Sequence, residues 1–111
     1  MKGMRRPRVF SLLGLARRAG RVASGTDATR RAIRQGEARL VLLAGDASSV
    51  QKDKVVKAIK QHPIPHAVLG DRTTLGTAIG RAPVSAVAVT DESLAKRMLD
   101  LIGVELERGG D

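Results

Sequence analysis

A chain of 111 residues with 42% hydrophobic residues has the length of one ordinary domain and can bury a core. It has no cysteine, which excludes disulfide bonds and thiolate metal sites, and no apolar run approaches the roughly 18 residues of a membrane span. The formal net charge is +9, and all of this excess lies in residues 1–39, where 11 Lys and Arg accompany two acids; residues 40–111 are balanced.

The predicted elements of the first third are two helices and a short strand. Apolar residues recur at helical spacing over 9–19, and Gly20 is suited to end this helix. Residues 21–23 can form a short strand, and the turn at 24–27 has side chains that cap helices. A second helix is expected over 27–35. Its outer face carries three clustered guanidiniums, those of Arg30, Arg31 and Arg34.

From residue 39 onward, strands and helices alternate. Apolar runs predict strands at 40–44, 67–69 and 84–89, and helical patterns predict helices at 46–61, at 71–79 and from residues 90–91 to Gly103, which should end the last one. Three strand–helix units in series predict an α/β fold with a largely parallel sheet covered on both faces. No repeat or linker divides residues 1–111, so we predict one domain with a core over about 9–102, a flexible basic N-terminal arm and a flexible polar tail from residue 105.

The concentration of positive charge in the first third favours a nucleic-acid partner. A local positive field attracts a polyanion because each neutralised phosphate releases condensed counterions, whereas charge that serves only solubility would be spread along the chain. Phe10 is the only aromatic residue, which excludes binding modes that stack several bases on aromatic rings. Nucleic acid would therefore be bound by Arg, Lys, backbone N–H groups and small side chains.

The turn Gly25-Thr26-Asp27 is the most informative segment, because it places a helix N-terminus beside the three arginines. The helix dipole and the free N–H groups favour an anion there, and Arg adds bidentate contacts to phosphate or guanine. The alternative is an ordinary capped surface helix with a solvated basic face, and these residues alone do not decide between the two.

No constellation of residues predicts an enzyme. Asp46 follows a buried strand, where sites of open α/β sheets often lie, but no second carboxylate accompanies it. His62 and His66 flank a Pro-Ile-Pro turn without a carboxylate, and no phosphate-binding glycine loop occurs. We therefore expect no catalytic residue, no metal and no small-molecule cofactor, and an orphan ligand site near Asp46 is the remaining enzymatic hypothesis. Without a signal peptide or membrane span, we expect a cytoplasmic monomer.

The order of motifs resembles the L-seven-Ae ribosomal-protein family over roughly residues 9–102. The start of the chain, together with Val89-Thr90-Asp91, is similar to the bacterial YlxQ-type branch of that family. The segments that carry the resemblance are Leu12–Gly20, Gly25–Gly36, Ala38–Ala47, Leu75–Gly80 and Val84–Val89.

The resemblance implies an α/β/α sandwich with a small mixed sheet and binding to kink-turns, which are sharply bent RNA duplexes with tandem sheared G·A pairs. In the family, the contacts come from a Gly-x-Asn-Glu-x-x-Lys region and from the loop before the last strand, and an acidic loop follows the first long strand. Together with the arginine cluster, the RNA-binding residues predicted here are Gly25, Thr26, Asp27, Ala28, Arg30, Arg31, Arg34, Asp46, Arg81, Ala82, Pro83, Val84 and Ser85.

The chain departs from the family pattern at the positions that read bases. The family's Asn is Asp27, which accepts hydrogen bonds but cannot donate them, its Glu is Ala28, and its Lys is Arg31. Phosphate contacts are kept, whereas sequence preference should be weaker or different. The hypothesis is a non-catalytic protein that binds ribosomal or other structured RNA; the alternative is a protein–protein adaptor on the translation machinery.

Overall fold

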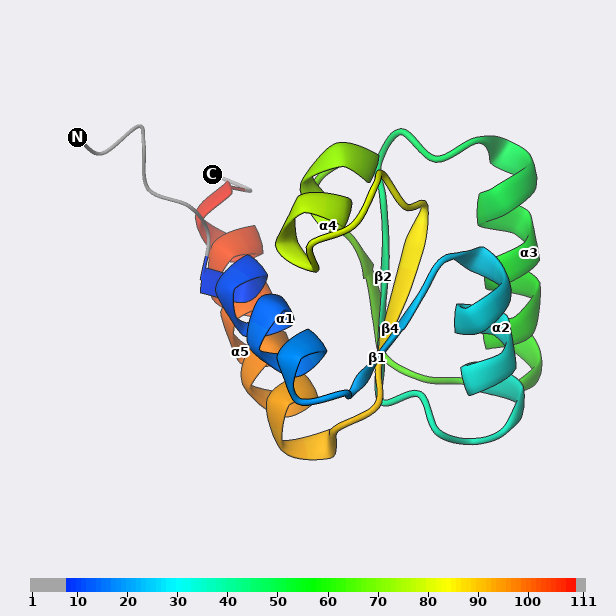
Figure 1. The fold of residues 1–111 in the computed structure, drawn as a ribbon, viewed down its shortest axis with the longest axis horizontal. Coiled ribbons are helices and arrows are strands. Elements are labelled where there is room, and N and C mark those ends of the chain that lie inside the picture. Colours follow the sequence, from blue (N-terminus) through cyan, green and yellow to red (C-terminus); the bar gives the residue numbers. More distant parts are fainter. Residues whose placement is uncertain (1–7, 110–111) are drawn as a thin grey trace.

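The computed structural model describes the backbone of residues 8–109 and the side chains of residues 8–103. The predicted elements of the core are all present, with ends shifted by a few residues at most, and Figure 1 shows their arrangement. In chain order they are α1 (Arg8–Arg18), β1 (Val22–Ser24), α2 (Thr26–Arg34), β2 (Leu40–Leu43), α3 (Ser49–Gln61), β3 (His66–Val68), α4 (Arg72–Ala78), β4 (Ala86–Val89) and α5 (Glu92–Gly109).

The last helix is longer than the sequence indicated. The prediction that Gly103 ends it is wrong, because α5 continues to Gly109, so residues 105–109 of the predicted flexible tail are helical. Glycine weakens a helix by only about 1 kcal/mol and does not by itself end one. The predicted flexible N-terminal arm at residues 1–7 and the last two residues lie outside the described part of the chain.

The sheet has four strands in the order β1-β4-β2-β3. The prediction of a largely parallel sheet is wrong: β2 and β3 pair in parallel, whereas β4 runs antiparallel to both β1 and β2. The reason lies in the connection from β3 to β4. This connection includes the short helix α4, and its end lies beside the start of α4, because the Val84 N–H donates to the Arg72 carbonyl at 3.1 Å. β4 therefore starts at the edge where β3 ends, and must run in the opposite direction.

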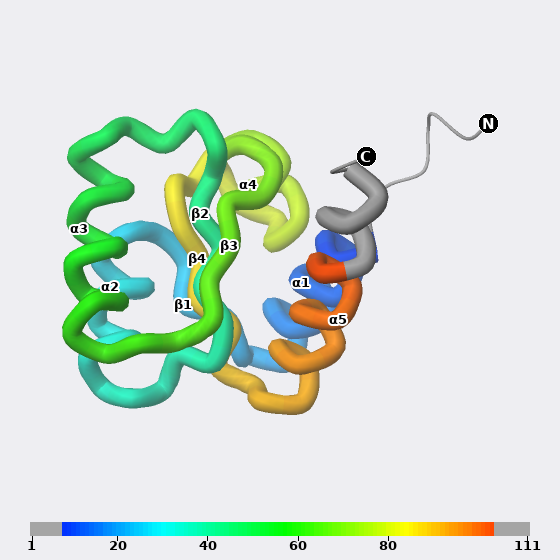
Figure 2. Tube along the Cα trace, turned by 180° about the vertical axis from the view of Figure 1, so that it is seen from behind, coloured from blue at the N-terminus to red at the C-terminus, as the bar shows by residue number. Residues whose placement is uncertain are grey.

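Helices cover both faces of the sheet, which confirms the α/β/α sandwich (Figure 1). Successive residues of a strand face opposite sides, so Leu40 and Leu42 pack with α1, α4 and α5, while Val41 and Leu43 pack with α2 and α3. Figure 2 shows the same two layers from behind. Among the described residues, no helix has both the length and the apolar character that crossing a membrane requires.

One edge of the sheet brings distant segments together. Strands β1, β2 and β3 end at this edge and β4 begins there, as the pairing registers show. The segments that follow or precede these strand ends are the Gly25 turn, the loop at Asp46, the turn at Gly70 and the loop at 81–85. The fold thus gathers the predicted site segments at one end of the sheet.

Candidate nucleic-acid interface

The first turn of α2 is held against the sheet by its backbone. The N-cap residue is Gly25, with φ 96° and ψ 163°, and no side chain caps the helix, so the predicted side-chain cap in the 24–27 turn is wrong. Instead the Gly25 N–H donates to the carbonyl of Ala86 at 2.9 Å. A positive φ is favourable for glycine and costly for other residues, which explains why a glycine stands between β1 and α2. The N–H groups at the start of α2 are left without a side-chain acceptor.

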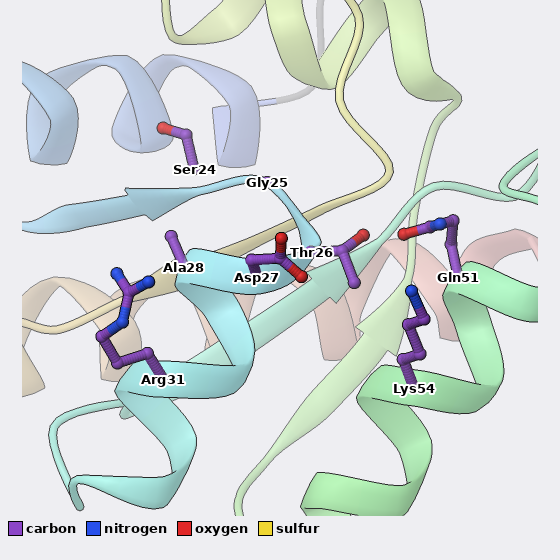
Figure 3. A pocket seen from close by; sticks show the side chains of 8 residues that line it. All are labelled: Ser24, Gly25, Thr26, Asp27, Ala28, Arg31, Gln51 and Lys54. Atoms are coloured by element: carbon purple, nitrogen blue, oxygen red, sulfur yellow. The ribbon is translucent and has the colours of Figure 1, made fainter.

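An open pocket with a volume of about 510 Å³ lies between the first turn of α2 and the first half of α3 (Figure 3). Five of the predicted RNA-binding residues line this pocket: Arg31 and the four residues from Gly25 to Ala28. It also contains two residues of α3 that the sequence analysis missed, Gln51 and Lys54. Their spacing places them on one side of a helix, but nothing in the sequence indicated that α3 packs beside α2. The lining residues are Ser24, Gly25, Thr26, Asp27, Ala28, Arg31, Gln51 and Lys54.

The three predicted arginines of α2 occupy different surroundings. Arg31 lines the pocket, and both Arg31 and Arg34 are exposed to solvent. Arg30 is folded onto the protein: its side chain is only 33% exposed, it lies 4.0 Å from the Asp27 carboxylate, and its buried Nε has no hydrogen-bond partner in the described protein. Arg31 and Arg34 are therefore the cations of α2 that are free to meet a ligand.

The loop at 81–85 lies beside the Gly25 turn because the loop leads directly into β4 and Gly25 is hydrogen-bonded to the first residue of β4. Ser85 accepts a hydrogen bond from the Ala44 N–H at 2.9 Å, and the next residue accepts the bond from Gly25. The loop also rests on α4, where the Arg81 N–H donates to the Gly76 carbonyl at 2.8 Å. Its first three residues, Arg81–Pro83, are exposed, whereas Val84 and Ser85 are half-buried.

Asp46 is engaged within the protein. Its Oδ1 accepts a hydrogen bond from the Arg72 N–H at 2.8 Å, and its Oδ2 lies 3.6 Å from the Arg72 guanidinium, with both side chains about half exposed. It joins the end of β2 to the start of α4 and does not line the pocket beside α2. The predicted contact of Asp46 with RNA therefore stays a prediction, and within the protein its side chain is bonded to Arg72.

Asp71 caps α4 and lies in the same region. Its Oδ1 accepts a hydrogen bond from the Thr74 N–H at 2.7 Å. This bond, with a second one from the Thr74 side chain, lowers the pKa of the Asp71 carboxyl below its ordinary value. The start of α4 is thus stabilised by two carboxylates, those of Asp46 and Asp71.

The two histidines do not form a site with acidic residues. Both are exposed, and the Nδ1 of His66 lies 3.1 Å from the Ile64 carbonyl, which gives that ring a local partner. Among the side chains that the structure describes, no three of His, Asp or Glu are grouped in a way that could hold a metal ion.

Comparison with known families agrees with this architecture. The sequence pattern of the ribosomal protein L7Ae/L30e/S12e/Gadd45 family matches residues 8–99. The chain belongs to this family. Within the L7Ae group, it is 41% identical over 93 residues to the RNA-binding protein YlxQ of Bacillus subtilis, a match that covers 84% of this chain and 93% of that protein. The large ribosomal subunit protein eL30 of Yarrowia lipolytica is 36% identical over 85 residues, covering 75% of this chain and 78% of eL30.

Solved structures of similar proteins have the same fold. A protein of unknown function from Bacillus halodurans C superposes with a TM-score of 0.83 at 33% identity, over 88% of this chain and 99% of that one. The Giardia lamblia 15.5kD RNA binding protein superposes with a TM-score of 0.70 at 19% identity, over 85% of this chain and 81% of that one, and supports the fold alone. The L7Ae-type sandwich is thus established for this chain.

Proposed function

We propose that this chain is a non-catalytic protein that binds structured RNA, ribosomal or other non-coding, through the start of α2 and the loop at 81–85. The observation that carries the proposal is the meeting of these two segments at one edge of the sheet, where the Gly25 N–H donates at 2.9 Å to the carbonyl of Ala86, the residue that follows the loop. Membership of the L7Ae family and similarity to proteins named RNA-binding support the class of ligand.

The proposed mechanism begins with phosphate binding at the first turn of α2. The N–H groups there have no side-chain cap, and the positive end of the helix dipole favours an anion. Arg31 and Arg34 lie three residues apart on the exposed face of the same helix, and their planar guanidiniums can contact phosphates on either side of a bend in the RNA. The loop at 81–85, whose first three residues are exposed, then packs against an extruded base.

Shape should contribute more to recognition than base identity. Where the family pattern has Asn and Glu, this chain has Asp27 and Ala28, so one amide donor and one carboxylate are absent from the base-reading positions. Phosphate contacts fix the orientation of RNA but carry no direct sequence information. The proposed ligand is therefore a kink-turn or a similarly bent duplex, selected by the path of its backbone.

The test is a comparison of two RNAs of equal length and charge, one containing a kink-turn and one a straight duplex. We expect tighter binding of the kinked RNA and a Kd that weakens steeply with salt, because several phosphates are neutralised. Mobility shifts at low and moderate salt measure both effects. Equal affinity for the two RNAs would contradict shape recognition.

The double variant Arg31→Ala/Arg34→Ala should raise the Kd for the kinked RNA by about 100-fold, since each lost charged contact contributes about 1.5 kcal/mol. The matched control is Arg17→Ala/Arg18→Ala, which removes the same charge from the exposed end of α1 on the other face of the sheet. If both double variants weaken binding equally, only net charge matters and the site on α2 is wrong.

A further inference from the structure

The pocket beside α2 has a second wall that the proposed contacts of α2 and the 81–85 loop do not use. This wall is the first half of α3, which begins at Ser49 after the Ser48 side chain caps it by accepting the Gln51 N–H at 3.2 Å. Gln51 and Lys54 lie one turn apart on the side of α3 that faces the pocket. An amide and an ammonium group thus face the same space as the first turn of α2.

Lys54 is available to a ligand. It is exposed, and no Asp or Glu of residues 8–103 lies within ion-pair distance of it. The neighbouring Lys52 differs, because its Nζ donates to the carbonyl of Gly45 at 3.1 Å. Of these two lysines, Lys54 is therefore the one whose ammonium group has no partner within the described protein.

The pocket keeps a net positive charge although it contains a carboxylate. Arg31 and Lys54 contribute two positive charges, and Asp27 contributes one negative charge. The Asp27 carboxylate also lies 4.0 Å from the Arg30 guanidinium on its own helix, which offsets part of its field. Figure 3 shows Arg31 on one side of Thr26 and Asp27, and Gln51 and Lys54 on the other. A chain of phosphates that crosses the first turn of α2 would meet one cation before it and one after it.

We infer that the RNA interface extends from α2 onto α3, with an unpaired RNA segment seated in the pocket. Lys54 contacts a different phosphate from the one at Arg31, and Gln51 donates to or accepts from the ribose or base between them. The volume of about 510 Å³ lies within the range of pockets that hold small ligands and is sufficient for one nucleotide. This inference rests on the proposed function, and it adds two binding residues and an unpaired nucleotide to it.

The test measures the salt dependence of binding to the kinked RNA for single variants of α3. Lys54→Ala should raise the Kd about fivefold at low salt and reduce the slope of log Kd against log salt by about 1, the change expected for one lost phosphate contact. Gln51→Ala should raise the Kd about threefold and leave the slope unchanged, because it removes a neutral hydrogen bond.

The matched control is Lys60→Ala, which removes the same charge from the same helix. Lys60 is exposed, does not line the pocket, and lies six residues, or about 9 Å along the helix axis, beyond Lys54. We expect it to leave the Kd within about twofold of wild type and the slope unchanged, since Lys60 does not line the pocket and contacts no phosphate seated there. Thermal melts of the two lysine variants should match wild type, because both lysines are exposed.

The outcomes separate the inference from the proposed function. If wild type binds the kinked RNA, Arg31→Ala weakens it, and Lys54→Ala behaves like Lys60→Ala, the extension onto α3 is wrong and the α2 site stands. If Lys54→Ala and Lys60→Ala reduce affinity and slope equally, α3 acts only through its net charge, and the seated segment is wrong. If wild type binds no kinked or bent RNA, the proposed function itself fails.

Discussion

Asp46 and Asp71 show how single side chains fix the start of α4 at the edge of the sheet. Each accepts one N–H of the first turn of α4, from Arg72 at 2.8 Å and from Thr74 at 2.7 Å. A helix of seven residues has few internal bonds, so these two acceptors satisfy a large share of its free donors. The carboxylates also place negative charge at the positive end of the helix. They position α4, on which the 81–85 loop rests.

We predict that the contribution of Asp71 to stability depends on pH. Its pKa is lowered below the ordinary value of 3.8 by the hydrogen bonds from Thr74. A carboxyl with a lower pKa in the folded chain stabilises the fold above its unfolded pKa, and this stabilisation is lost as the pH falls through the folded pKa. Wild type should therefore melt at a higher temperature than Asp71→Asn at neutral pH, and the two should converge below pH 3.8.

Thermal melts followed by circular dichroism across this pH range check the prediction. Asn retains an oxygen that can accept the Thr74 N–H, so the comparison isolates the charge from the cap. If the difference in Tm between wild type and Asp71→Asn stays constant down to the lowest pH measured, the charge of Asp71 does not contribute to stability.

At the scale of elements, the packing of α4 against the loop at 81–85 depends on Gly76. A Cβ atom at this position would lie 2.9 Å from the Arg81 carbonyl oxygen and closer still to the carbonyl of Ala82. Both neighbours are backbone atoms, which cannot move aside as a flexible side chain does. The close approach of α4 and the loop therefore requires glycine, and it fixes the loop beside the start of α2.

We predict that Gly76→Ala displaces this loop, lowers stability by about 1–3 kcal/mol through overpacking, and weakens RNA binding. The control is Gly103→Ala on α5, where a Cβ atom meets nothing within 4 Å and where helix propensity should raise stability by about 0.5–1 kcal/mol. Urea unfolding and RNA titration of both variants measure the effects. RNA affinity unchanged in folded Gly76→Ala would mean that the loop is not part of the interface.

Element identities were predictable, whereas strand directions were not. The apolar run at Leu40–Leu43 and the start of the last helix at Asp91 depend on neighbouring residues, and the structure confirms both of them. The direction of β4 depends on the closing hydrogen bond between Val84 and Arg72, which are twelve residues apart. Serial strand–helix units usually give parallel pairs, so the local pattern favoured the wrong direction.

At the scale of the whole molecule, the net charge of +9 should act in opposite directions on folding and on binding. Like charges repel one another in the compact state, and salt screens this repulsion. RNA binding releases counterions and therefore weakens as salt rises. We predict that the Tm of the free protein rises between low and moderate salt while its affinity for the kinked RNA falls.

Parallel thermal melts and RNA titrations at matched salt concentrations check this pair of trends. Sodium chloride is suitable because its ions act mainly by screening. A Tm that falls with salt would indicate that ion pairs, such as the one between Asp46 and Arg72 at 3.6 Å, outweigh the repulsion.

The sequence by itself determined the elements, the placement of positive charge and the family, because all three depend on local patterns or on the order of motifs along the chain. Residues 25–36 alone indicated a helix with Arg31 and Arg34 on its outer face. Only the tertiary structure decided that Arg30 folds back toward Asp27, that Asp46 is bonded to Arg72, and that α3 supplies the second wall of the pocket. The Asp46–Arg72 bond and the pocket wall on α3 join residues brought together by packing around the sheet, and such contacts leave no periodic signal along the chain. Arg30 and Asp27 are neighbours on one helix, but their spacing alone does not show that the Arg30 side chain folds onto the protein.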